Sequence, residues 1–360
     1  MQWLSIIFIL PYLFLLLRIY RGLRGVKSFI PEKDPSTAVS LIIPCHNEEN
    51  DLPLLLDDVK SQNYPQELLE IIVVDDNSTD KTADVVRYGN FGANIRLLPA
   101  SGRGKKLALR TGINAAKGEL IVTTDADCRA GGNWIRTVSL FYEKCGASLI
   151  ISPVKTAIHK SITGRFQELE FLGLQGITCG TAVAGRPVMC NGANLAFNKE
   201  TYLRHSDNLH DEINSGDDVF LLHSIKTEKN HKIEWLESAD ATVITRQKNT
   251  FSAFFKQRKR WISKSTSYSD SDTIILGVAT FMAVLLQAAT FILSIINPAY
   301  AALFLAVFIL KSIPDFLILK NTSVRYNNAK ITRWFIPSQV IYPFYVLGVL
   351  LSPSAVRMKG

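Results

Sequence analysis

The stretch VSLIIPCHNEE, residues 39–49, decides the fold class, because a short aliphatic and β-branched run ends abruptly in polar residues. The pattern returns in EIIVVDDNSTD at residues 70–80 and in ELIVTTDAD at residues 119–127. Two further runs of this type occupy residues 95–98 and 148–152. Helical patterns separate the runs, at residues 50–62, 79–88, 105–117 and 132–144. Strands that alternate with helices in this way predict an α/β domain with a mostly parallel sheet.

Polar residues follow three of these strands where each strand ends. They are His46 to Glu49, Asp75 to Asp80, and the pair Asp125 and Asp127. In an open parallel sheet, ligands bind beyond the carboxyl ends of the strands, so we expect the three clusters to meet at one edge. Each cluster alone has another interpretation, since Asp, Asn and Ser also form turns and cap helices.

The pair Asp125 and Asp127 could share a hard divalent cation through oxygen ligands. Mg²⁺ or Mn²⁺ suits these ligands, and such ions usually also take oxygens from a substrate diphosphate. The sequence GRGKK at residues 102–106 provides a positive charge, Lys105, and glycines that let the backbone approach a ligand closely. It lacks the spacing of a Walker loop, and no Gly-x-Gly-x-x-Gly follows the first strand, which excludes Walker ATPases and dinucleotide oxidoreductases. The pattern favours a nucleotide diphosphate ligand.

The 360-residue chain is 47% hydrophobic and has a formal net charge of +8. Its mean hydropathy is +0.13. The excess positive charge lies in three groups beside apolar segments: Arg18, Arg21, Arg24 and Lys27; Lys256, Arg258, Lys259, Arg260 and Lys264; Lys320, Arg325, Lys330 and Arg333. A nucleic-acid binder would spread basic residues over its folded domain, so we expect no nucleic-acid partner. Charged groups that flank apolar segments indicate membrane lipids as partners instead.

Four apolar stretches are predicted to span a membrane: residues 1–20, 273–296, 299–319 and 334–356. The first lacks a basic n-region and a cleavage site, which favours an anchor over a removed signal peptide. Asn297-Pro298 separates the second span from the third. The positive-inside bias places all three basic groups, and the domain at residues 35–248, on the cytoplasmic side. We therefore expect an integral protein of a bacterial inner membrane with a cytosolic catalytic domain.

Two charges lie inside the third predicted span, because Lys311 and Asp315 stand at i, i+4 spacing. An ionisable residue within a membrane is a functional candidate. The alternative is a local ion pair in which Lys311 extends toward the inner face.

Six motifs, in order, resemble the family 2 glycosyltransferases. They are SLIIPCHNEE (40–49), VVDDNSTD (73–80), TTDAD (123–127), MCNGANLAF (189–197), GDDVFL (216–221) and QRKRW (257–261). The resemblance covers about residues 39–261, and the apolar segments are placed as in the family's integral-membrane branch. It implies a GT-A fold and inverting transfer of a hexose or N-acetylhexosamine from a nucleotide-sugar, usually a UDP-sugar, with Mn²⁺ or Mg²⁺ as cofactor.

The resemblance also implies roles for individual residues. Asp218 takes the position of the catalytic base, and Asp125 and Asp127 form the metal-binding Asp-x-Asp pair, with Asp127 as the direct ligand. The nucleotide-sugar would contact Pro44, Glu48, Asp75, Asp76, Lys105, Asp125, Gln257 and Arg260. The acceptor would contact Asn191, Gly192, Asp217 and Trp261. Asp217 stands where the family commonly has Glu, and both aspartates could instead serve as favourable charge at a helix N-terminus.

The sixth motif is predicted to lie on an amphipathic interfacial helix at residues 249–265. Gln257, Arg260 and Trp261 fall on one face, where the guanidinium could bind a diphosphate oxygen and the indole a sugar ring. A second face predicts an ordinary interfacial helix. On it Phe251, Phe254, Phe255 and Trp261 would meet lipid, and Lys256, Arg258, Lys259 and Lys264 headgroups. Both can hold, and the helix would then place the active site against the bilayer.

That location predicts a lipid or lipid-linked glycan acceptor, since a water-soluble acceptor gives no reason to hold the site at a membrane. The sixth motif is similar to that of ceramide glucosyltransferases, but also to that of hyaluronan, cellulose and poly-N-acetylglucosamine synthases. A processive polysaccharide synthase with coupled export is therefore the alternative. A non-enzymatic membrane scaffold or transporter is disfavoured by the retained Asp76, Asp125, Asp127 and Asp218.

Overall fold

A computed structural model describes residues 2–92, 94–157, 160–210, 213 and 215–352. The chain forms two compact units. The sheet unit comprises residues 27–157 and 189–246, and the helical unit comprises residues 1–26, 158–188 and 247–360. The middle of the chain therefore leaves the sheet unit once and returns to it.

The sheet unit is built on a seven-stranded sheet in the order β3-β2-β1-β4-β8-β6-β9. The first four strands along the chain pair in parallel: β1 (Val39–Cys45), β2 (Leu69–Asp75), β3 (Ile95–Pro99) and β4 (Leu120–Thr123). β8 (Leu195–Asn198) is antiparallel to β4 and to β6 (Leu149–Ile151), while β9 (Ile233–Trp235) runs parallel to β6. The prediction of an α/β fold with a mostly parallel sheet is confirmed.

The predicted strands and helices form because their apolar residues can be buried on both sides of the sheet. All seven residues of β1 are buried, as expected for a central parallel strand. The connecting helices are α2 (Leu52–Lys60), α3 (Thr82–Tyr88), α4 (Lys105–Ala115) and α5 (Trp134–Cys145). α3 begins three residues after the predicted Thr79, because the Thr79 N–H donates to Asn47 Oδ1 at 2.8 Å in a turn.

Several short elements of the sheet unit carry too little sequence signal to be predicted. β8 is one, and a small second sheet joins β5 (Arg129–Ala130), β10 (Val243–Thr245) and β7 (Val154–Thr156). These strands pair across sequence distances of about a hundred residues, so local periodicity does not reveal them. α7 (Lys199–His205) and α8 (Asp217–Lys226) also belong to the unit, and α8 begins at the two aspartates of the fifth motif, where a helix N-terminus was the alternative interpretation.

Among its described residues, the helical unit contains four helices that are long and apolar enough to cross a membrane, at residues 3–24, 271–296, 298–325 and 329–351. Their main helical segments are α1 (Leu10–Arg24), α10 (Ser271–Ile296), α11 (Ala301–Arg325) and α12 (Phe335–Leu351). One is amino-terminal and three are carboxyl-terminal, which confirms the predicted number and order of long apolar helices; that they cross a membrane stays a prediction. Residues 353–356 of the fourth prediction lie outside the described residues.

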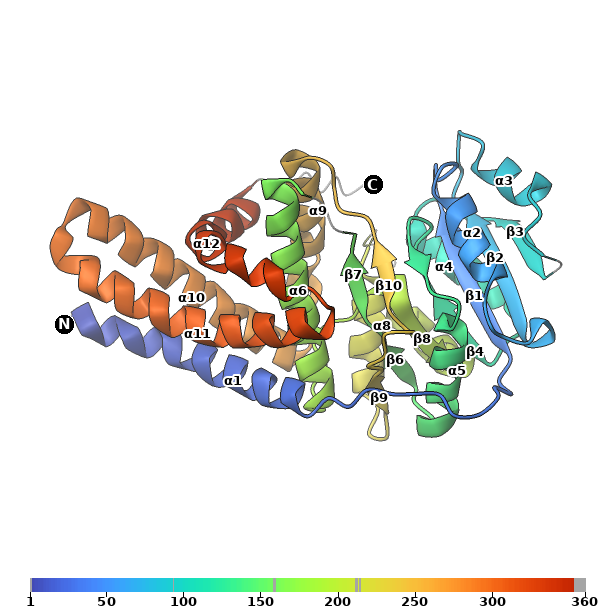
Figure 1. Cartoon of the computed structure of the whole chain (residues 1–360), viewed down its shortest axis with the longest axis horizontal. Helices are drawn as coiled ribbons and strands as arrows, with labels where there is room; N and C mark the ends of the chain where they lie inside the picture. Colours follow the sequence, from blue (N-terminus) through green and yellow to red (C-terminus); the bar gives the residue numbers. More distant parts are fainter. Residues whose placement is uncertain (1, 93, 158–159, 211–212, 214, 353–360) are drawn as a thin grey trace. The chain divides into compact units, whose positions relative to one another are not determined.

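Two more helices complete this unit: α9 (Phe251–Ser263), which carries the sixth motif, and α6 (Ile162–Val183). The sequence analysis did not predict α6. It packs against α1 and α11, and α1 runs beside α10 and α11 in Figure 1. The α6–α1 contact needs glycine, because a Cβ on Gly180 would lie 2.5 Å from the carbonyl oxygen of Ile19.

Candidate active site

The parallel register brings the three polar clusters of the sheet unit to the same edge. Cys45 at the end of β1 lies opposite Asp75 at the end of β2, and the Asp76 N–H donates to the Cys45 carbonyl at 2.8 Å. β4 ends beside β1, where the Thr124 N–H donates to the Ile42 carbonyl at 3.3 Å. The strand pairing therefore brings the ends of β1, β2 and β4 together, as predicted for the three polar clusters.

Asp76 holds the loop that leads into α4. Both of its carboxylate oxygens accept the Gly104 N–H at 2.9 Å. Gly104 has φ +105°, a conformation that residues with a side chain rarely adopt. The neighbouring Asn77 amide donates to the Gly102 carbonyl at 3.2 Å. These bonds fix Lys105 as the first residue of α4.

The Lys105 ammonium lies among three carboxylates. It donates to Asp125 Oδ1. Burial lowers the pKa of Lys105, but Asp125, Asp217 and Asp218 outweigh it and raise the pKa above the ordinary range. Its side chain remains 42% exposed. Lys105 is therefore a permanent positive charge open to an anionic ligand.

Asp218 and Gly192 meet beside this lysine. The Gly192 N–H donates to Asp218 Oδ2 at 3.0 Å. A Cβ on Gly192 would lie 3.8 Å from Lys105 Nζ and 3.6 Å from the Asp218 Cβ. Gly192 is held by Thr123 of β4, whose hydroxyl donates to its carbonyl at 2.9 Å. The structure thus brings together Asp76, Lys105, Asp125, Asp218 and Gly192 from five separate segments.

The first two residues of α8 are Asp217 and Asp218. Both stand where a carboxylate is favourable at a helix N-terminus. Gly216 precedes them with φ +93°, which turns the chain sharply into the helix. Asp218 also reaches Gly192 and acts on the Lys105 pKa, so capping does not account for all of its contacts.

Other predicted donor and acceptor residues take structural positions at this edge. Pro44 is buried within β1, and Asp75 Oδ1 accepts the Ser78 N–H at 3.1 Å in the turn after β2. The Glu48 N–H donates to the Thr82 hydroxyl at 2.7 Å. The Asn191 side chain accepts the Ala193 N–H at 3.0 Å. Their contacts with a ligand stay predictions.

The residues after β4 fit a divalent cation. Asp125 and Asp127 are half-buried, and Cys128 Sγ donates weakly to Asp127 Oδ1 at 3.8 Å. Burial, together with both aspartates, raises the pKa of Cys128, so its thiol stays neutral. The described residues contain no group of three or more His, Cys, Asp or Glu placed to hold a metal. A cation here would need oxygens from a ligand and water, which suits Mg²⁺ or Mn²⁺.

Gln257, Arg260 and Trp261 lie on α9, in the helical unit. Arg258, between them, contacts the motif on both sides: its Nη1 donates to Gln257 Oε1 at 2.8 Å, and its guanidinium lies 4.0 Å from the Trp261 ring centroid. Their contact with a donor or acceptor stays a prediction.

The interfacial assignment of Arg258 and Phe254 was wrong. Arg258 is 6% exposed and Phe254 is 0% exposed. Arg258 is buried because the two oxygens of Glu170 in α6 accept its Nε at 2.8 and 2.7 Å. Phe254 is buried because it packs against Tyr345 and Val349 of α12. Glu170 was missed because α6 was missed, and nothing in the local sequence distinguishes it from the neighbouring Glu168.

Lys106 was also missed, because the sequence alone cannot assign different roles to two adjacent lysines. It is 5% exposed and donates to the carbonyls of Leu209 and His210 at 2.6 and 2.7 Å. These bonds tie α4 to the segment that precedes α8. Lys105 faces the carboxylates, and Lys106 anchors the chain behind them.

Comparison with known proteins identifies relatives of part of the chain. Residues 40–181 match the family model described as Glycosyl transferase family 2. The chain is 34% identical over 155 residues to the probable glycosyltransferase YdaM of Bacillus subtilis, covering 39% of this chain and 36% of that protein. It is 32% identical over 123 residues to the dolichyl-phosphate beta-glucosyltransferase of Homo sapiens, covering 31% and 38%. The chain thus spans little more than a third of the length of these curated relatives.

A solved structure shares the fold over nearly the whole chain. It is the mannosyltransferase PcManGT from Pyrobaculum calidifontis in complex with GDP-Man and Mn²⁺. The TM-score is 0.59 at 20% identity, and the alignment covers 98% of this chain and 100% of that one. At this identity the similarity concerns the fold alone.

Proposed function

Because this chain carries a glycosyl transferase family 2 domain, we propose that it is an inverting glycosyltransferase. It moves a hexose or N-acetylhexosamine from a nucleotide-sugar, preferably a UDP-sugar, to a membrane-embedded lipid or lipid-linked glycan. The observation that carries the proposal is the cluster of Lys105, Asp125 and Asp218 around Gly192 at the carboxyl edge of the sheet.

The donor end of the proposed reaction rests on Lys105 and Asp125. A lysine with a raised pKa supplies a fixed positive charge for a diphosphate. Asp125 and Asp127 would hold Mn²⁺ or Mg²⁺, which would stabilise charge on the leaving diphosphate. The structural relative was solved with a nucleotide-sugar, GDP-Man, and a divalent cation, Mn²⁺, and the proposal invokes these two classes of ligand. Gln257 and Arg260 are proposed to bind the same diphosphate.

The acceptor end rests on Asp218. An inverting transfer needs one base that takes the proton of the acceptor hydroxyl as its oxygen attacks the anomeric carbon. The Asp218 carboxylate is half-buried, and the Gly192 N–H and the Val219 N–H, at 3.0 and 2.8 Å, fix its orientation. Gly192 has no side chain, which leaves the space between Lys105 and Asp218 open to a sugar. Trp261, Asn191 and Asp217 would orient the acceptor.

The acceptor class follows from the four apolar helices. A curated relative is named for transfer to dolichyl-phosphate, a lipid acceptor. An active site carried by a membrane-spanning chain meets such an acceptor without extracting it from the bilayer. A catalytic unit on the cytoplasmic side of the membrane would also meet soluble nucleotide-sugars directly.

The test is transfer by the full chain, purified and returned to lipid vesicles. Radiolabelled UDP- and GDP-sugars are supplied with total membrane lipids, and products are sorted into lipid-extractable and polymeric fractions. We expect one sugar to enter the lipid fraction, a chelator to stop the reaction, and Mn²⁺ or Mg²⁺ to restore it. A polymer would establish a processive synthase instead, and no labelled product with any donor would contradict the proposed activity.

Undiminished transfer by the metal-free protein would contradict the assignment of Asp125 and Asp127. The matched variant is Asp127→Asn, which keeps the size of the side chain and removes its charge. We expect this variant to need a higher Mn²⁺ concentration for half-maximal rate, while Asp84→Asn on the exposed side of α3 serves as control.

A further inference from the structure

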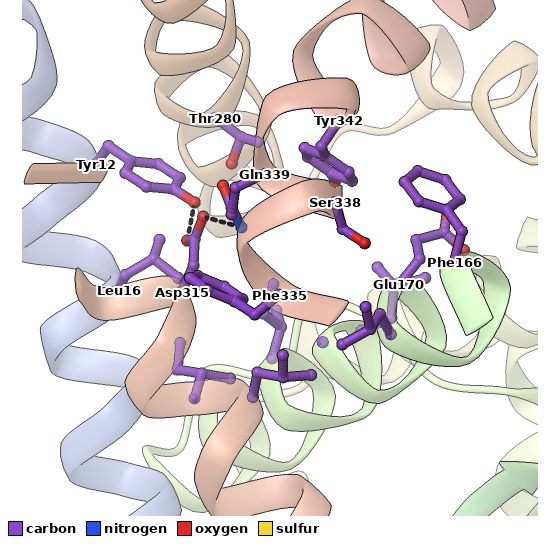
Figure 2. Close-up of a pocket in the computed structure, with 16 residues that line it drawn as sticks. Tyr12, Leu16, Phe166, Glu170, Thr280, Asp315, Phe335, Ser338, Gln339 and Tyr342 are labelled. Carbon is purple, nitrogen blue, oxygen red and sulfur yellow. Dashed lines mark hydrogen bonds between the residues drawn. The ribbon is translucent and has the colours of Figure 1, made fainter. Parts of the chain in front are cut away.

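The helical unit contains a partly open cavity of about 120 Å³ that the transfer chemistry does not use. An apolar space of this size can hold a small group such as a ring or a short alkyl segment. Figure 2 shows its lining side chains, which come from α1, α6, α10, α11 and α12. Four of these helices are the candidate membrane spans. Most of the wall is hydrocarbon, including Leu16, Phe166, Leu169, Ile318 and Phe335.

One end of the cavity carries a closed polar network. Lys311 is 0% exposed, and its ammonium donates to Asp315 Oδ2 at 2.8 Å and to Gln339 Oε1 at 3.1 Å. The Gln339 amide and the Tyr12 hydroxyl also donate to Asp315, and both side chains point at it in Figure 2. Lys311 therefore does not extend toward the inner face, and its charge is neutralised inside the unit.

Glu170 is the second carboxylate in the wall, and it is also neutralised from behind. Arg258 holds both of its oxygens, and the Tyr345 hydroxyl donates to Oε1 at 3.0 Å. The described residues that line the cavity include these two carboxylates but no Lys, Arg or His. An anionic headgroup would meet two carboxylates without a facing cation. A cation would gain little, because each carboxylate already has a buried partner.

Two hydroxyls remain for a ligand. Within the described part of the chain, Ser338 and Tyr342 line the cavity and their hydroxyls form no hydrogen bond. Both come from α12, one turn apart. A hydroxyl can donate and accept, so the pair suits an uncharged ligand group that does the same. The hydrocarbon wall suits an alkyl or isoprenoid chain attached to that group.

We infer that this cavity binds the head of a lipid alcohol: an uncharged membrane lipid whose free hydroxyl bonds Ser338 and Tyr342, whose first carbons lie against the hydrocarbon wall, and whose remaining chain leaves through the open side of the cavity. Diacylglycerols and ceramides have this chemistry, whereas a lipid phosphate does not. The inference does not depend on the proposed transfer reaction, because it concerns binding within the helical unit alone.

Photolabelling of the full chain tests this inference. The protein is reconstituted into phosphatidylcholine vesicles that contain a diacylglycerol with a diazirine in one acyl chain, or the phosphatidic acid with the same chains. After illumination, labelled peptides are mapped by mass spectrometry. We expect diacylglycerol to label α6 or α12 at least fivefold more than phosphatidic acid. Equal labelling by the two lipids would overturn the selectivity for an uncharged head.

Glycines offer a matched pair of variants. Gly173 lines the cavity and Gly277 is exposed on α10, and a Cβ on either meets no atom within 4 Å. We expect Gly173→Phe to fill the cavity and cut labelling at least fivefold, while Gly277→Phe labels normally. Unchanged labelling of Gly173→Phe would place the lipid elsewhere.

A smaller change, which adds no volume and so should not disturb folding, tests the hydroxyl contact. Ser338→Ala removes one hydrogen-bond partner. We expect about a fivefold weaker competition by unlabelled diacylglycerol, as for one lost hydrogen bond. Thermal unfolding of each variant shows whether the fold is intact. If unlabelled diacylglycerol competes equally well with Ser338→Ala and with the native chain, Ser338 is not part of the site.

Discussion

At the scale of single residues, adjacent positions in this chain have opposite environments. Lys105 is open to the site and surrounded by carboxylates, whereas Lys106 is buried on backbone carbonyls. Arg258 is buried on Glu170, whereas Arg260, two residues later, is exposed. Charge alone therefore does not identify a ligand-binding residue. The partner within hydrogen-bond reach does, and that partner comes from another segment.

Asp218→Asn is expected to abolish transfer while donor binding is largely kept. The amide oxygen can still accept the Gly192 N–H, but an amide cannot take the acceptor proton at neutral pH. Loss of a general base costs typically 10²–10⁴-fold in rate. Initial rates and equilibrium binding of the nucleotide-sugar measure the two effects, and normal turnover would remove Asp218 from the base role.

Glu143 is expected to make stability depend on acid pH. It is 9% exposed and accepts the Ser36 and Thr37 N–H groups at 2.7 and 3.0 Å. Burial raises the pKa of Glu143, but these bonds, Lys33 and the Thr37 hydroxyl outweigh it and lower the pKa to about 2. Since this pKa is depressed in the folded state, its contribution is complete above about pH 4.5 and lost as pH falls toward 2.

The variant Glu143→Gln tests that contribution, which we put at about 3 kcal/mol. We expect a lower unfolding temperature than the native chain at pH 7, and a difference that shrinks as pH falls below 4. The comparison of two chains at each pH cancels the titration of all other groups. A difference that does not change with pH would contradict the assigned pKa.

At the scale of elements, α6 links the other helices of the helical unit, because it contacts several of them. It packs on α1 and α11 through glycines, and its Glu170 holds Arg258 of α9 and Tyr345 of α12. A larger residue in place of Gly176 would also be crowded, since its Cβ would lie 2.5 Å from Thr322 Oγ1. Small residues let helix backbones approach closely in apolar surroundings. α6 therefore determines how the spans pack.

Gly180→Leu is expected to destabilise the helical unit. Its side chain would enter the backbone of α1 at Ile19, and such overpacking costs typically about 1–3 kcal/mol or more when the neighbour is backbone. Gly277→Leu is the control, since its site on α10 is open. Thermal unfolding in detergent measures the difference, and equal unfolding temperatures for the two variants would contradict the close α1–α6 contact.

At the scale of the whole molecule, four candidate spans among the described residues and three basic groups predict a topology. The proposed arrangement is one crossing, a cytoplasmic catalytic region and three further crossings. It places the turn at Asn297 on the outer side of the membrane and the segment around Lys330 on the cytoplasmic side.

Thiol labelling of intact cells checks this topology. Asn297→Cys is expected to react with an impermeant maleimide from outside, and Lys330→Cys only after permeabilisation. The native chain supplies the background, because its cysteines are buried or half-buried. The reverse labelling pattern would show that the protein has the opposite orientation, with the donor site outside the cytoplasm.

Sequence patterns alone predicted the alternation of strands and helices, the four long apolar segments, and the polar clusters at the strand ends. Each of these is a local pattern, in which residues a few positions apart share a period or a charge. Parallel pairing then brings Asp76, Lys105 and Asp125 to one edge, so most of the candidate site could be predicted.

Four features became apparent only in the folded chain: the place of α6, the burial of Arg258, the network around Lys311, and the cavity that these helices line. Glu170 and Arg258 are 88 positions apart, and Tyr12 and Asp315 are 303 apart. Local periodicity carries no information about such pairs, because burial compensates each charge only after distant segments have packed together.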